Sequence, residues 1–544
     1  MKFIKLLFGE ARRDRTPLLL ASTLPGVMMS GVIALVTTVA NQDQSKGPNL
    51  YLMAFFFIAS VALLLAMNYA LNATTTVISN FILQKRLDIA RAVRSLDLEA
   101  YENIGAMRVD FAIGRDLQTI EEAAPTVIVL IYFVTQLLSS ALYIGYLSLI
   151  AFAVTLLFLG VATFFYRSSY AHAEALSKEA TELESAFRSS FDHLLRGFRE
   201  IKMNARRDTD LFDNYIVQRA LAVQDLRVSS GRGFNRGQTL SDAFFYGLLG
   251  CMVFLTPYYI SNSSTPAKII LVIVFSGGAI ASLIQALPAV SRADLAVDRL
   301  HALERELEQA KRAAETGPGA SPAVLAHGIA LRGVSYTYKS PGDQQGFHVG
   351  PCDLFIKAGE ITFIAGGNGS GKSTLLNLIT QLYAQDAGEV RWDDKTVTDA
   401  NATAYRQLFS VIFSDFHLFD RLYGLDAAHD DLADLIREMD LSDKVHYNLG
   451  RFSTTDLSSG QRKRLAMVSA LAEGRPVLIF DEWAADQDPQ FRRYYYEKLL
   501  PRLKAAGKTI IAVSHDDRWF NAADKVVWME EGKVQRVMTT PAAT

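Results

Sequence analysis

Six long apolar runs in the first 290 residues of this 544-residue chain restrict how that part can fold. Each run is close to the roughly 20 residues that an α-helix needs to cross about 30 Å of hydrocarbon. Residues 291–544 have the composition of an ordinary water-soluble domain. The sequence therefore predicts a membrane-spanning part followed by a soluble part. The predicted spans are Pro17–Ala40, Tyr51–Thr74, Val127–Ile144, Leu147–Tyr166, Ala243–Ile260 and Ile269–Val290.

The positions of lysine and arginine predict the orientation of these spans. The N-terminal segment and the loops 80–125 and 167–240 are rich in both residues, whereas the links 41–50 and 261–267 contain only Lys46. We therefore expect a multi-pass membrane protein with both termini and both long loops in the cytoplasm. The third and fourth spans are separated only by a Gly-Tyr pair at 145–146, which predicts a tight hairpin.

The second long loop is predicted to be helical. Its apolar residues recur at three- and four-residue steps, which gives an apolar stripe opposite a charged face. Such helices would carry the spans tens of Å into the cytoplasm, where they either transmit movement or serve only as a packing surface. The stripe consists of Leu183, Phe187, Phe191, Leu194, Phe198 and Ile201.

Domain boundaries follow from a change in composition. A charged helix is predicted over Ser291–Ala314, and the Gly-, Pro- and Ser-rich stretch after it reads as a linker. We therefore predict a transmembrane domain with six helices at 1–315, a linker at 316–326 and a soluble domain at 327–544.

Charge and cysteine content exclude several classes of protein. The 55 basic and 57 acidic residues leave no positive surplus, which argues against a nucleic-acid partner. Cys251 and Cys352 are the only cysteines, so a disulfide framework is not expected. The basic N-terminus precedes an apolar run without a cleavage site, and we expect this run to remain as an anchor.

Residues 366–373 read GGNGSGKS and fit the P-loop pattern, in which backbone N–H groups and a lysine hold phosphates. A predicted strand, Glu360–Ala365, precedes the loop and a predicted helix follows it, as this mechanism requires. Lys372 would neutralise the β- and γ-phosphates, Ser373 would bind Mg²⁺ and Thr374 would support the phosphate oxygens. The residues expected to hold ATP here are Gly366, Asn368, Gly369, Ser370, Gly371, Lys372, Ser373 and Thr374.

Two acidic residues end the next informative segment. Val477–Phe480 has the pattern of a buried parallel strand, and Asp481 follows at the edge where open α/β sheets bind ligands. Asp481 could hold Mg²⁺ directly or through water. Glu482 beside it is the natural general base for an attacking water. The alternative is an exposed acidic strand end without a catalytic role.

The segment Leu457-Ser-Ser-Gly-Gln461 opens a second predicted helix, which is a second anion site because a helix N-terminus attracts negative charge. Two such helix starts are one more than a single nucleotide needs. The segment resembles the signature of ATP-binding-cassette (ABC) ATPases, and the elements around it occur in the order of that family. We expect Ser458, Gly460 and Gln461 to serve a nucleotide held by another chain.

This resemblance implies roles for further residues. His515, after the apolar strand Thr509–Ala512, is similar to the family's switch histidine and would contact the γ-phosphate as a catalytic residue beside Glu482 and Lys372. Tyr338 resembles the aromatic that stacks on adenine; Tyr336 is its competitor, and a core strand aromatic is the alternative. Asp488 matches the acid of the loop that crosses the dimer interface.

The implied fold is an α-helical six-span transmembrane domain like that of type I ABC exporters, fused to an α/β P-loop ABC ATPase domain. Three positions depart from the family pattern. Ser414 stands at the usual coupling-loop glutamine, with Ser414 or Asp415 as substitutes, Ser459 stands at a usual glycine and Trp483 at a common proline. With the segment Phe198–Asn204, these departures resemble the branch that exports cyclic peptides, which includes exporters of pyoverdine precursors, syringomycin-type lipopeptides and lasso-type microcins.

The resemblance implies a homodimeric half-transporter of the bacterial inner membrane, with ATP and Mg²⁺ as cofactors. Its predicted function is export of a peptide-type cargo: a cyclic or lasso peptide, a lipopeptide or a siderophore precursor. The partners would be a second copy, membrane lipid and this cargo. A broad-range drug exporter and a lipid flippase are alternatives, as is an ATP-regulated scaffold or channel. No charged residue lies deep in a span, which favours a large, weakly charged, amphipathic cargo over an ion; the polar residues there are Asn68, Asn72, Gln136 and Gln285.

Overall fold

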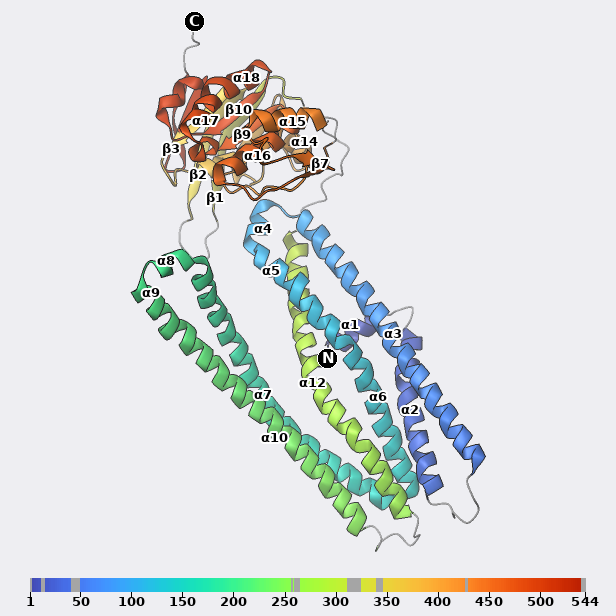
Figure 1. Cartoon of the computed structure of the whole chain (residues 1–544). Helices are drawn as coiled ribbons and strands as arrows, with labels where there is room; N and C mark the ends of the chain where they lie inside the picture. The colour runs from blue at the N-terminus through green and yellow to red at the C-terminus, as the bar shows by residue number, and fades with distance from the viewer. Residues whose placement is uncertain are drawn as a thin grey trace. The chain divides into compact units, whose positions relative to one another are not determined.

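The chain forms two compact units in a computed structural model (Figure 1). The helical unit comprises Met1–Ile89 and Met107–Arg305, and the α/β unit comprises Ala90–Ala106 and Glu306–Thr544. The structure describes residues 2–10, 15–40, 49–255, 258, 265–310, 324–338, 346–425 and 429–539.

The helical unit consists of long helices joined by short turns. It begins with α1 (Lys2–Glu10), α2 (Arg15–Ala40) and α3 (Leu50–Arg94). After α4 (Leu98–Ile104), which belongs to the α/β unit, the chain continues through short and long helical segments. They are α5 (Ala106–Phe111), the π-helical turn η2 (Ala112–Asp116), α6 (Leu117–Leu147), α7 (Leu149–Arg196), α8 (Phe198–Lys202), α9 (Ala205–Thr209), η3 (Asp210–Val217), α10 (Gln218–Phe254) and α12 (Thr265–Ala310).

Five helices in the described ranges are long and apolar enough to cross a membrane. The predicted span Ala243–Ile260 lies partly outside these ranges, and its described part forms the end of α10. The sixth span therefore stays a prediction. The five helices run over Leu19–Ala40, Leu50–Arg94, Ala106–Leu147, Leu149–Arg196 and Thr265–Ala310.

The predicted position of the hairpin between the third and fourth spans is wrong. Gly145 and Tyr146 lie inside α6, and the turn between the third and fourth spans falls at Ser148. Ser148 is extended, and its hydroxyl accepts a hydrogen bond from the Ala151 N–H at 3.3 Å, so it caps α7. The predicted charged helix Ser291–Ala314 is confirmed for its described part, which runs to Ala310 and continues α12 from the span without a break.

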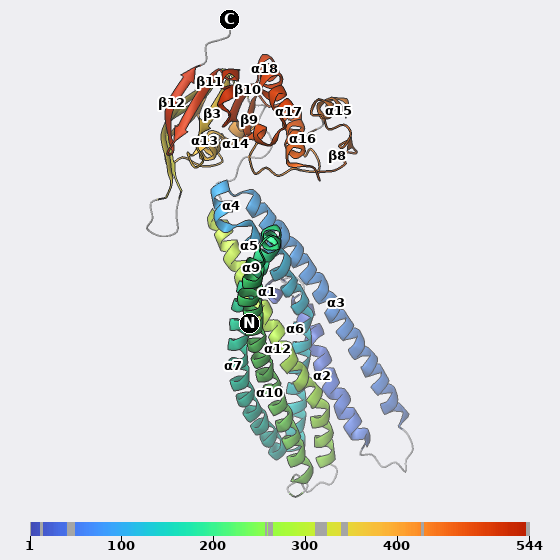
Figure 2. The same ribbon diagram turned by 60° about the vertical axis from the view of Figure 1, so that its left-hand side comes forward.

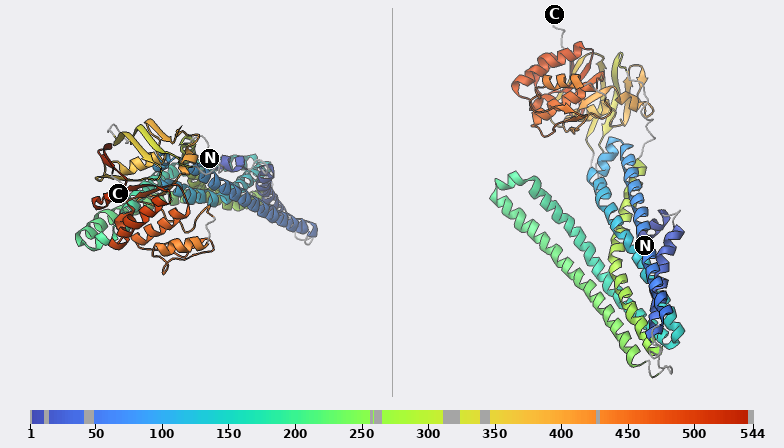
Figure 3. Two further views of the ribbon diagram at one scale, coloured as in Figure 1. Left: turned by 90° about the horizontal axis from the view of Figure 1, so that it is seen from above. Right: turned by 45° about the vertical axis from the view of Figure 1, so that its right-hand side comes forward.

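The predicted helical loops are confirmed. Helix α7 has 48 residues, which corresponds to about 70 Å at 1.5 Å per residue. Figures 1 and 3 show α7 and α10 side by side, diverging from α6 and α12 toward the end that carries α8 and α9. Close approach of α7 and α10 is possible at Gly233, where a Cβ atom would lie 2.9 Å from that of Ala173.

Polar contacts fix the other helices of this unit. Ser30 of α2 donates to the Gln136 carbonyl of α6 at 3.0 Å, a typical small-residue contact between membrane helices. Asp116 is buried and pairs with Arg299 of α12 at 2.5 Å. Lys85 pairs with Glu304 at 2.7 Å, which ties α3 to the same end of α12.

The α/β unit is built on a six-stranded sheet in the order β12-β11-β3-β10-β9-β6 (Figure 2). Strands β11, β3, β10, β9 and β6 are parallel, and β12 pairs antiparallel with β11. Strands β3, β9 and β10 are buried at every position, which reflects burial on both faces of the sheet. The strands are β3 (Ile361–Gly366), β6 (Phe409–Ile412), β9 (Val477–Asp481), β10 (Thr509–Val513), β11 (Lys525–Glu530) and β12 (Lys533–Thr539).

A second, antiparallel sheet has the order β2-β1-β4-β5, and β7 and β8 form a separate pair. One apolar core lies between the two larger sheets, and another lies between the parallel sheet and helices that include α16. The smaller strands are β1 (Gly328–Thr337), β2 (His348–Lys357), β4 (Ala387–Trp392), β5 (Lys395–Thr396), β7 (Tyr447–Asn448) and β8 (Arg451–Phe452). The helices and helical turns are α13 (Lys372–Ile379), α14 (Ala402–Arg406), α15 (His429–Glu438), α16 (Ser459–Ala472), η4 (Trp483–Asp486), α17 (Pro489–Tyr494), η5 (Tyr495–Leu499), α18 (Leu500–Ala505) and η6 (Asp517–Ala522).

Candidate functional site

The P-loop connects β3 to α13 at the carboxyl edge of the parallel sheet. Gly366 has φ 149°, and a Cβ atom there would lie 2.2 Å from the Met529 carbonyl oxygen, so only glycine fits beside β11. Gly371 has φ 97° where α13 begins. Ser370 Oγ is buried and forms no hydrogen bond with the described residues. The loop therefore offers a buried hydroxyl and the start of a helix to an anion.

Lys372 points back over this loop. Its Nζ donates to the carbonyl oxygens of Gly366 at 3.2 Å and Gly367 at 2.8 Å. Burial lowers the pKa of Lys372, while the carboxylates of Glu482 and Asp481 act in the opposite direction. A positive charge is thus held between the loop and the two carboxylates.

Asp481 and Glu482 lie at the carboxyl end of β9. Strand β9 is adjacent to β10, and β10 is adjacent to β3, the strand before the P-loop. Asp481 is paired in register with Val513 of β10, which in turn is paired with Ile364 of β3. Burial raises the pKa of Asp481. Glu482 lies at the solvent edge, where its Oε1 is 2.9 Å from Nε2 of His515.

The strand β6 brings Ser414 to the same edge. Ser414 follows β6, and its backbone N–H donates to Asp481 Oδ2 at 3.4 Å. Hydrogen bonds from Ser414 offset part of the effect of burial, but the pKa of Asp481 stays raised. The position that departs from the family glutamine therefore contacts the carboxylate predicted to bind the metal.

Tyr338 and Tyr336 differ in exposure. Tyr336 is 3% exposed and belongs to the core, whereas Tyr338 is 36% exposed just after β1. The Tyr338 hydroxyl lies 3.0 Å from Oγ1 of Thr374 on the P-loop helix. Of these two tyrosines, only Tyr338 therefore has a ring that is available to a ligand.

The predicted signature residues form the start of α16. The Ser458 hydroxyl accepts from the Gln461 N–H, and the Gln461 side chain accepts from the Ser458 N–H, which makes a capping box. Gln461 also accepts from Lys444 at 3.5 Å, and the Gly460 carbonyl accepts from Gln487 at 3.1 Å. Among the described residues, these hydrogen bonds do not connect the signature to the P-loop of the same chain.

Sequence reasoning missed several residues that link α16 to the loop after β9. Lys463 is 6% exposed and contacts Glu482 and Asp486. Arg464 donates to Gln487 at 2.9 Å and pairs with Asp488, the acid assigned to the dimer interface. A sequence signal for Lys463 did exist, because its spacing places it on the same helical face as the buried Met467 and Ala470.

Helix α4, in the first long loop, packs into the α/β unit. Leu98 packs against the core between the sheets. Tyr383 donates to Glu102 at 2.7 Å, and its ring stacks on Tyr336 at 4.9 Å and contacts Tyr338 edge-on at 5.9 Å. The chain between two predicted spans is therefore attached beside the exposed tyrosine.

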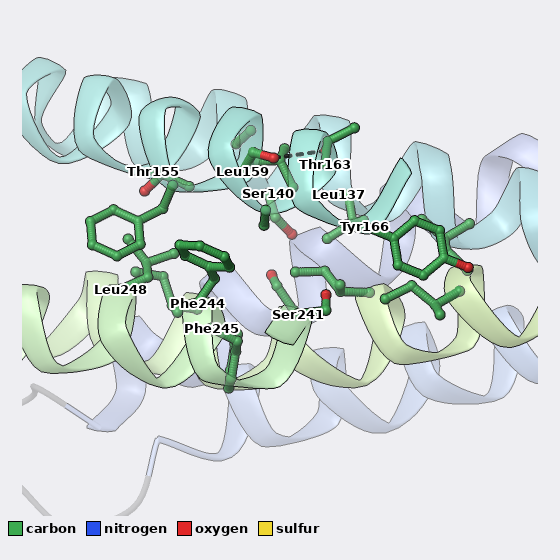
Figure 4. Close-up of a pocket in the computed structure, with 18 of the residues that line it drawn as sticks. Leu137, Ser140, Thr155, Leu159, Thr163, Tyr166, Ser241, Phe244, Phe245 and Leu248 are labelled. Atoms are coloured by element: carbon green, nitrogen blue, oxygen red, sulfur yellow. Dashed lines mark hydrogen bonds between the residues drawn. The ribbon is translucent and has the colours of Figure 1, made fainter. Parts of the chain in front are cut away.

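A cavity of about 380 Å³ lies between α6, α7, α10 and α12 in the helical unit (Figure 4). Its wall is aliphatic and aromatic, and it contains no charged side chain and none of the four polar span residues singled out from the sequence. The hydroxyls of Thr155, Thr163 and Ser276 donate to carbonyls of their own helices. Figure 4 shows Phe244, Phe245 and Leu248 of α10 along one side. The cavity thus offers apolar surface with few free donors.

The site defines a class of protein in which a nucleotide-binding α/β unit is joined to membrane helices. A family model described as ABC transporter matches residues 349–485. ATP-binding protein SyrD of Pseudomonas syringae pv. syringae is 31% identical over 529 residues, which cover 94% of this chain and 92% of that protein.

The fold of the whole chain has a solved counterpart. A bacterial Atm1-family ABC exporter with ATP bound covers 97% of this chain, with 95% of its own length matched, a TM-score of 0.74 and 16% identity. An ATP-dependent lipid A-core flippase of Francisella novicida is 32% identical over 194 residues, which cover 33% of this chain and 32% of that protein. The chain belongs to the ABC transporter family, as an exporter whose ATPase unit hydrolyses ATP to drive transport.

Proposed function

We propose that this chain is a homodimeric half-transporter that exports a peptide-type cargo across the bacterial inner membrane, with both termini in the cytoplasm. The observation that carries the dimer is the separation of two anion-binding features, since the P-loop and the start of α16 share no hydrogen bond among the described residues. Each ATP would lie between the P-loop of one chain and Ser458, Gly460 and Gln461 of its partner.

Within each site, Lys372 would hold the phosphates, Glu482 would accept a proton from the attacking water, and His515 would orient Glu482 and contact the γ-phosphate. Their convergence at one sheet edge supports these roles, because phosphoryl transfer depends mainly on positioning and charge. The adenine would stack on Tyr338, which is exposed where Tyr336 is not.

The residues at this edge fit Mg²⁺. Mg²⁺ in nucleotide sites uses one or two protein ligands together with phosphates and water. Ser373 is exposed at the start of α13, and Asp481 offers a carboxylate from the neighbouring part of the sheet. The unpartnered Ser370 hydroxyl fits the phosphates themselves. Bound Mg²⁺ would neutralise charge on the β- and γ-phosphates.

The resemblance of Ser414, Ser459, Trp483 and the segment Phe198–Asn204 to the branch that exports cyclic peptides is the ground for proposing a peptide-type cargo, and two observations agree with it. The relative SyrD matches almost the whole chain, including the membrane helices, whereas the lipid A-core flippase matches about a third of it. The cavity between α6, α7, α10 and α12 suits an uncharged, apolar part of a cargo. The cargo would be a cyclic or lasso peptide, a lipopeptide or a siderophore precursor. A drug exporter or lipid flippase remains the second candidate because the same apolar cavity would suit it.

The long helices would carry ATP-driven movement to the spans. Phe198 and Met203, at the α8 end of the α7–α10 hairpin, are 54% and 88% exposed, so apolar side chains are available there for contact with another part of the transporter. Helix α4 supports the same role, because Glu102 ties the first loop to Tyr383 of the ATPase unit.

The proposal is tested with purified chain in lipid vesicles. A cyclic lipopeptide is expected to stimulate ATP hydrolysis and to accumulate in inside-out vesicles in an ATP-dependent manner, and Glu482→Gln is expected to abolish both. Stimulation by lipid A but not by any peptide would favour the flippase. Normal hydrolysis by Glu482→Gln would exclude Glu482 as the general base.

A further inference from the structure

Lys463 is a buried cation in contact with the proposed general base. Its Nζ donates to the Glu482 carbonyl oxygen at 2.7 Å and lies 2.8 Å from Asp486 Oδ2. A lysine is rarely buried unless its charge is paired, and here the Asp486 carboxylate provides the pair. The same ammonium group thus binds the backbone of one residue and the side chain of another in the loop after β9.

The backbone of Glu482 needs such support. Glu482 has φ 50° and ψ 33°, in the left-handed region that residues other than glycine seldom adopt. Its carbonyl is held by Lys463, and its carboxylate is held by His515 at 2.9 Å. Because both groups belong to Glu482, a rotation of its backbone that moves the carbonyl also moves the carboxylate away from His515. Without the Lys463 donor, the Glu482 carbonyl keeps only the longer hydrogen bond from the Ala485 N–H at 3.3 Å, and the peptide after Glu482 is held less firmly in its left-handed conformation.

Trp483 makes the reverse connection. Its indole Nε1 donates to the Lys463 carbonyl oxygen at 2.7 Å, and its ring is 1% exposed against Tyr495 at 4.8 Å. Two consecutive residues after β9 are thus bonded to a single residue of α16, one to its side chain and one to its backbone. We name Lys463, Glu482, Trp483 and Asp486 the lysine clamp.

A third bond joins the loop to the signature itself. Gln487 is 4% exposed, and its Nε2 donates to the Gly460 carbonyl at 3.1 Å. At Gly460 a Cβ atom would lie 2.8 Å from the Asp486 carbonyl oxygen, so the helix and the loop are in direct contact. Hydrogen bonds and direct contact therefore connect the start of α16 to the loop that begins with Glu482.

We propose that Lys463 is a positioning residue for Glu482, and that the lysine clamp couples the two ATP sites of the dimer. This inference rests on the proposed function, in which α16 contacts the partner's nucleotide while Glu482 serves the nucleotide of its own chain. Contact of Ser458–Gln461 with one ATP fixes α16, and the clamp passes this restraint to the general base of the other site. Each carboxylate is then aligned only when the opposite site is filled.

The first test is Lys463→Met in the full-length dimer in lipid nanodiscs. Methionine keeps most of the side-chain volume and removes the donor and the charge. The kcat for ATP is expected to fall on the order of 10- to 100-fold, as small misplacements of catalytic groups do, and the Hill coefficient to fall toward one. The KM and the binding of trinitrophenyl-ATP should stay within about twofold. Lys504→Met is the matched control, because it removes a lysine that pairs with Asp524 at 2.6 Å instead, and it should leave kcat unchanged.

A double mutant separates positioning from general stability. If Lys463 acts through Glu482, adding Lys463→Met to Glu482→Gln lowers the residual rate no further. Lys463→Gln, which retains one donor, is expected to give an intermediate kcat and is measured in the same way should the methionine variant fail to fold. A normal kcat in a folded Lys463 variant, with Glu482→Gln inactive, overturns the inference and leaves the proposed function intact; loss of ATP binding in step with kcat also overturns it. Normal ATP hydrolysis by Glu482→Gln instead excludes Glu482 as the general base, which is the part of the proposed function on which this inference rests.

Discussion

Replacement of Trp483 by phenylalanine should destabilise the ATPase unit by a measurable and separable amount. The indole of Trp483 is 1% exposed, and its N–H donates to the Lys463 carbonyl. Phenylalanine removes this hydrogen bond, which lowers the unfolding free energy by about 1 kcal/mol. The loss is no larger because the Lys463 carbonyl still accepts its hydrogen bond within α16. The smaller ring leaves a void beside Tyr495, for about 1–2 kcal/mol more. The expected loss of unfolding free energy is therefore about 2–3 kcal/mol.

The assay uses the distribution of tryptophan in the chain. All four tryptophans, Trp392, Trp483, Trp519 and Trp528, lie in the ATPase unit, so tryptophan emission during heating follows this unit and not the membrane helices. For a unit of this size, 1 kcal/mol corresponds to roughly 2–4 °C in Tm. Trp483→Phe is expected to lower the Tm by about 4–12 °C.

The matched control is Trp528→Phe, which removes the same fluorophore from a position that is 40% exposed. Partly exposed positions of this kind usually change stability by less than about 0.5 kcal/mol, so the control Tm should move by no more than about 2 °C. Equal shifts for the two variants would refute the reasoning, because Trp483 would then contribute no more to stability than a ring at the surface.

Three further outcomes follow from single contacts. Tyr383→Phe removes the donor to Glu102 and should weaken the attachment of α4 by about 1 kcal/mol, seen as roughly fivefold faster amide hydrogen exchange in residues 98–104; unchanged exchange would contradict it. Burial raises the pKa of Cys352 to about 11, so its thiol stays protonated at pH 8 and should react with maleimide only after unfolding, not at the same rate in both states. Gly460→Ala would place a Cβ atom 2.8 Å from the Asp486 carbonyl and should lower ATP hydrolysis at least about tenfold, whereas an alanine variant with the parental rate would mean that α16 can move away without loss.

The site's framework could be predicted because local patterns determine it. Buried apolar runs predicted β3, β9 and β10, and the registers of these strands place the P-loop, Asp481 and His515 at one edge. In a parallel sheet, the carboxyl ends of neighbouring strands lie at the same edge. The strand patterns alone therefore predict that the residues following these strands lie close together. The signature helix was likewise predicted from its apolar spacing, and α16 begins at Ser459 with Ser458 as its N-cap.

Contacts that depend on tertiary packing could not be predicted in this way. Lys463 and Trp483 are twenty residues apart, and neither has a local sequence partner that predicts their hydrogen bond. Helix ends in the membrane unit were also uncertain, because apolar runs continue through a turn. Ser148 ends α6 by its extended backbone and begins α7 with a side-chain cap, inside a stretch whose composition hardly changes.

The three departures from the family pattern have different physical meanings. Ser459 is exposed at the first residue of α16 and has no positive φ, so a side chain is tolerated where glycine is usual. The next residue, Gly460, cannot change in the same way because the Asp486 carbonyl occupies the space of its Cβ atom. Ser414 reaches Asp481 through its backbone, a contact that does not require glutamine. Trp483 differs from Ser459 and Ser414, since a proline at this position would have no side-chain N–H to donate to the Lys463 carbonyl. Among these positions, Trp483 is therefore the one at which restoring the common residue should break the clamp that holds Glu482.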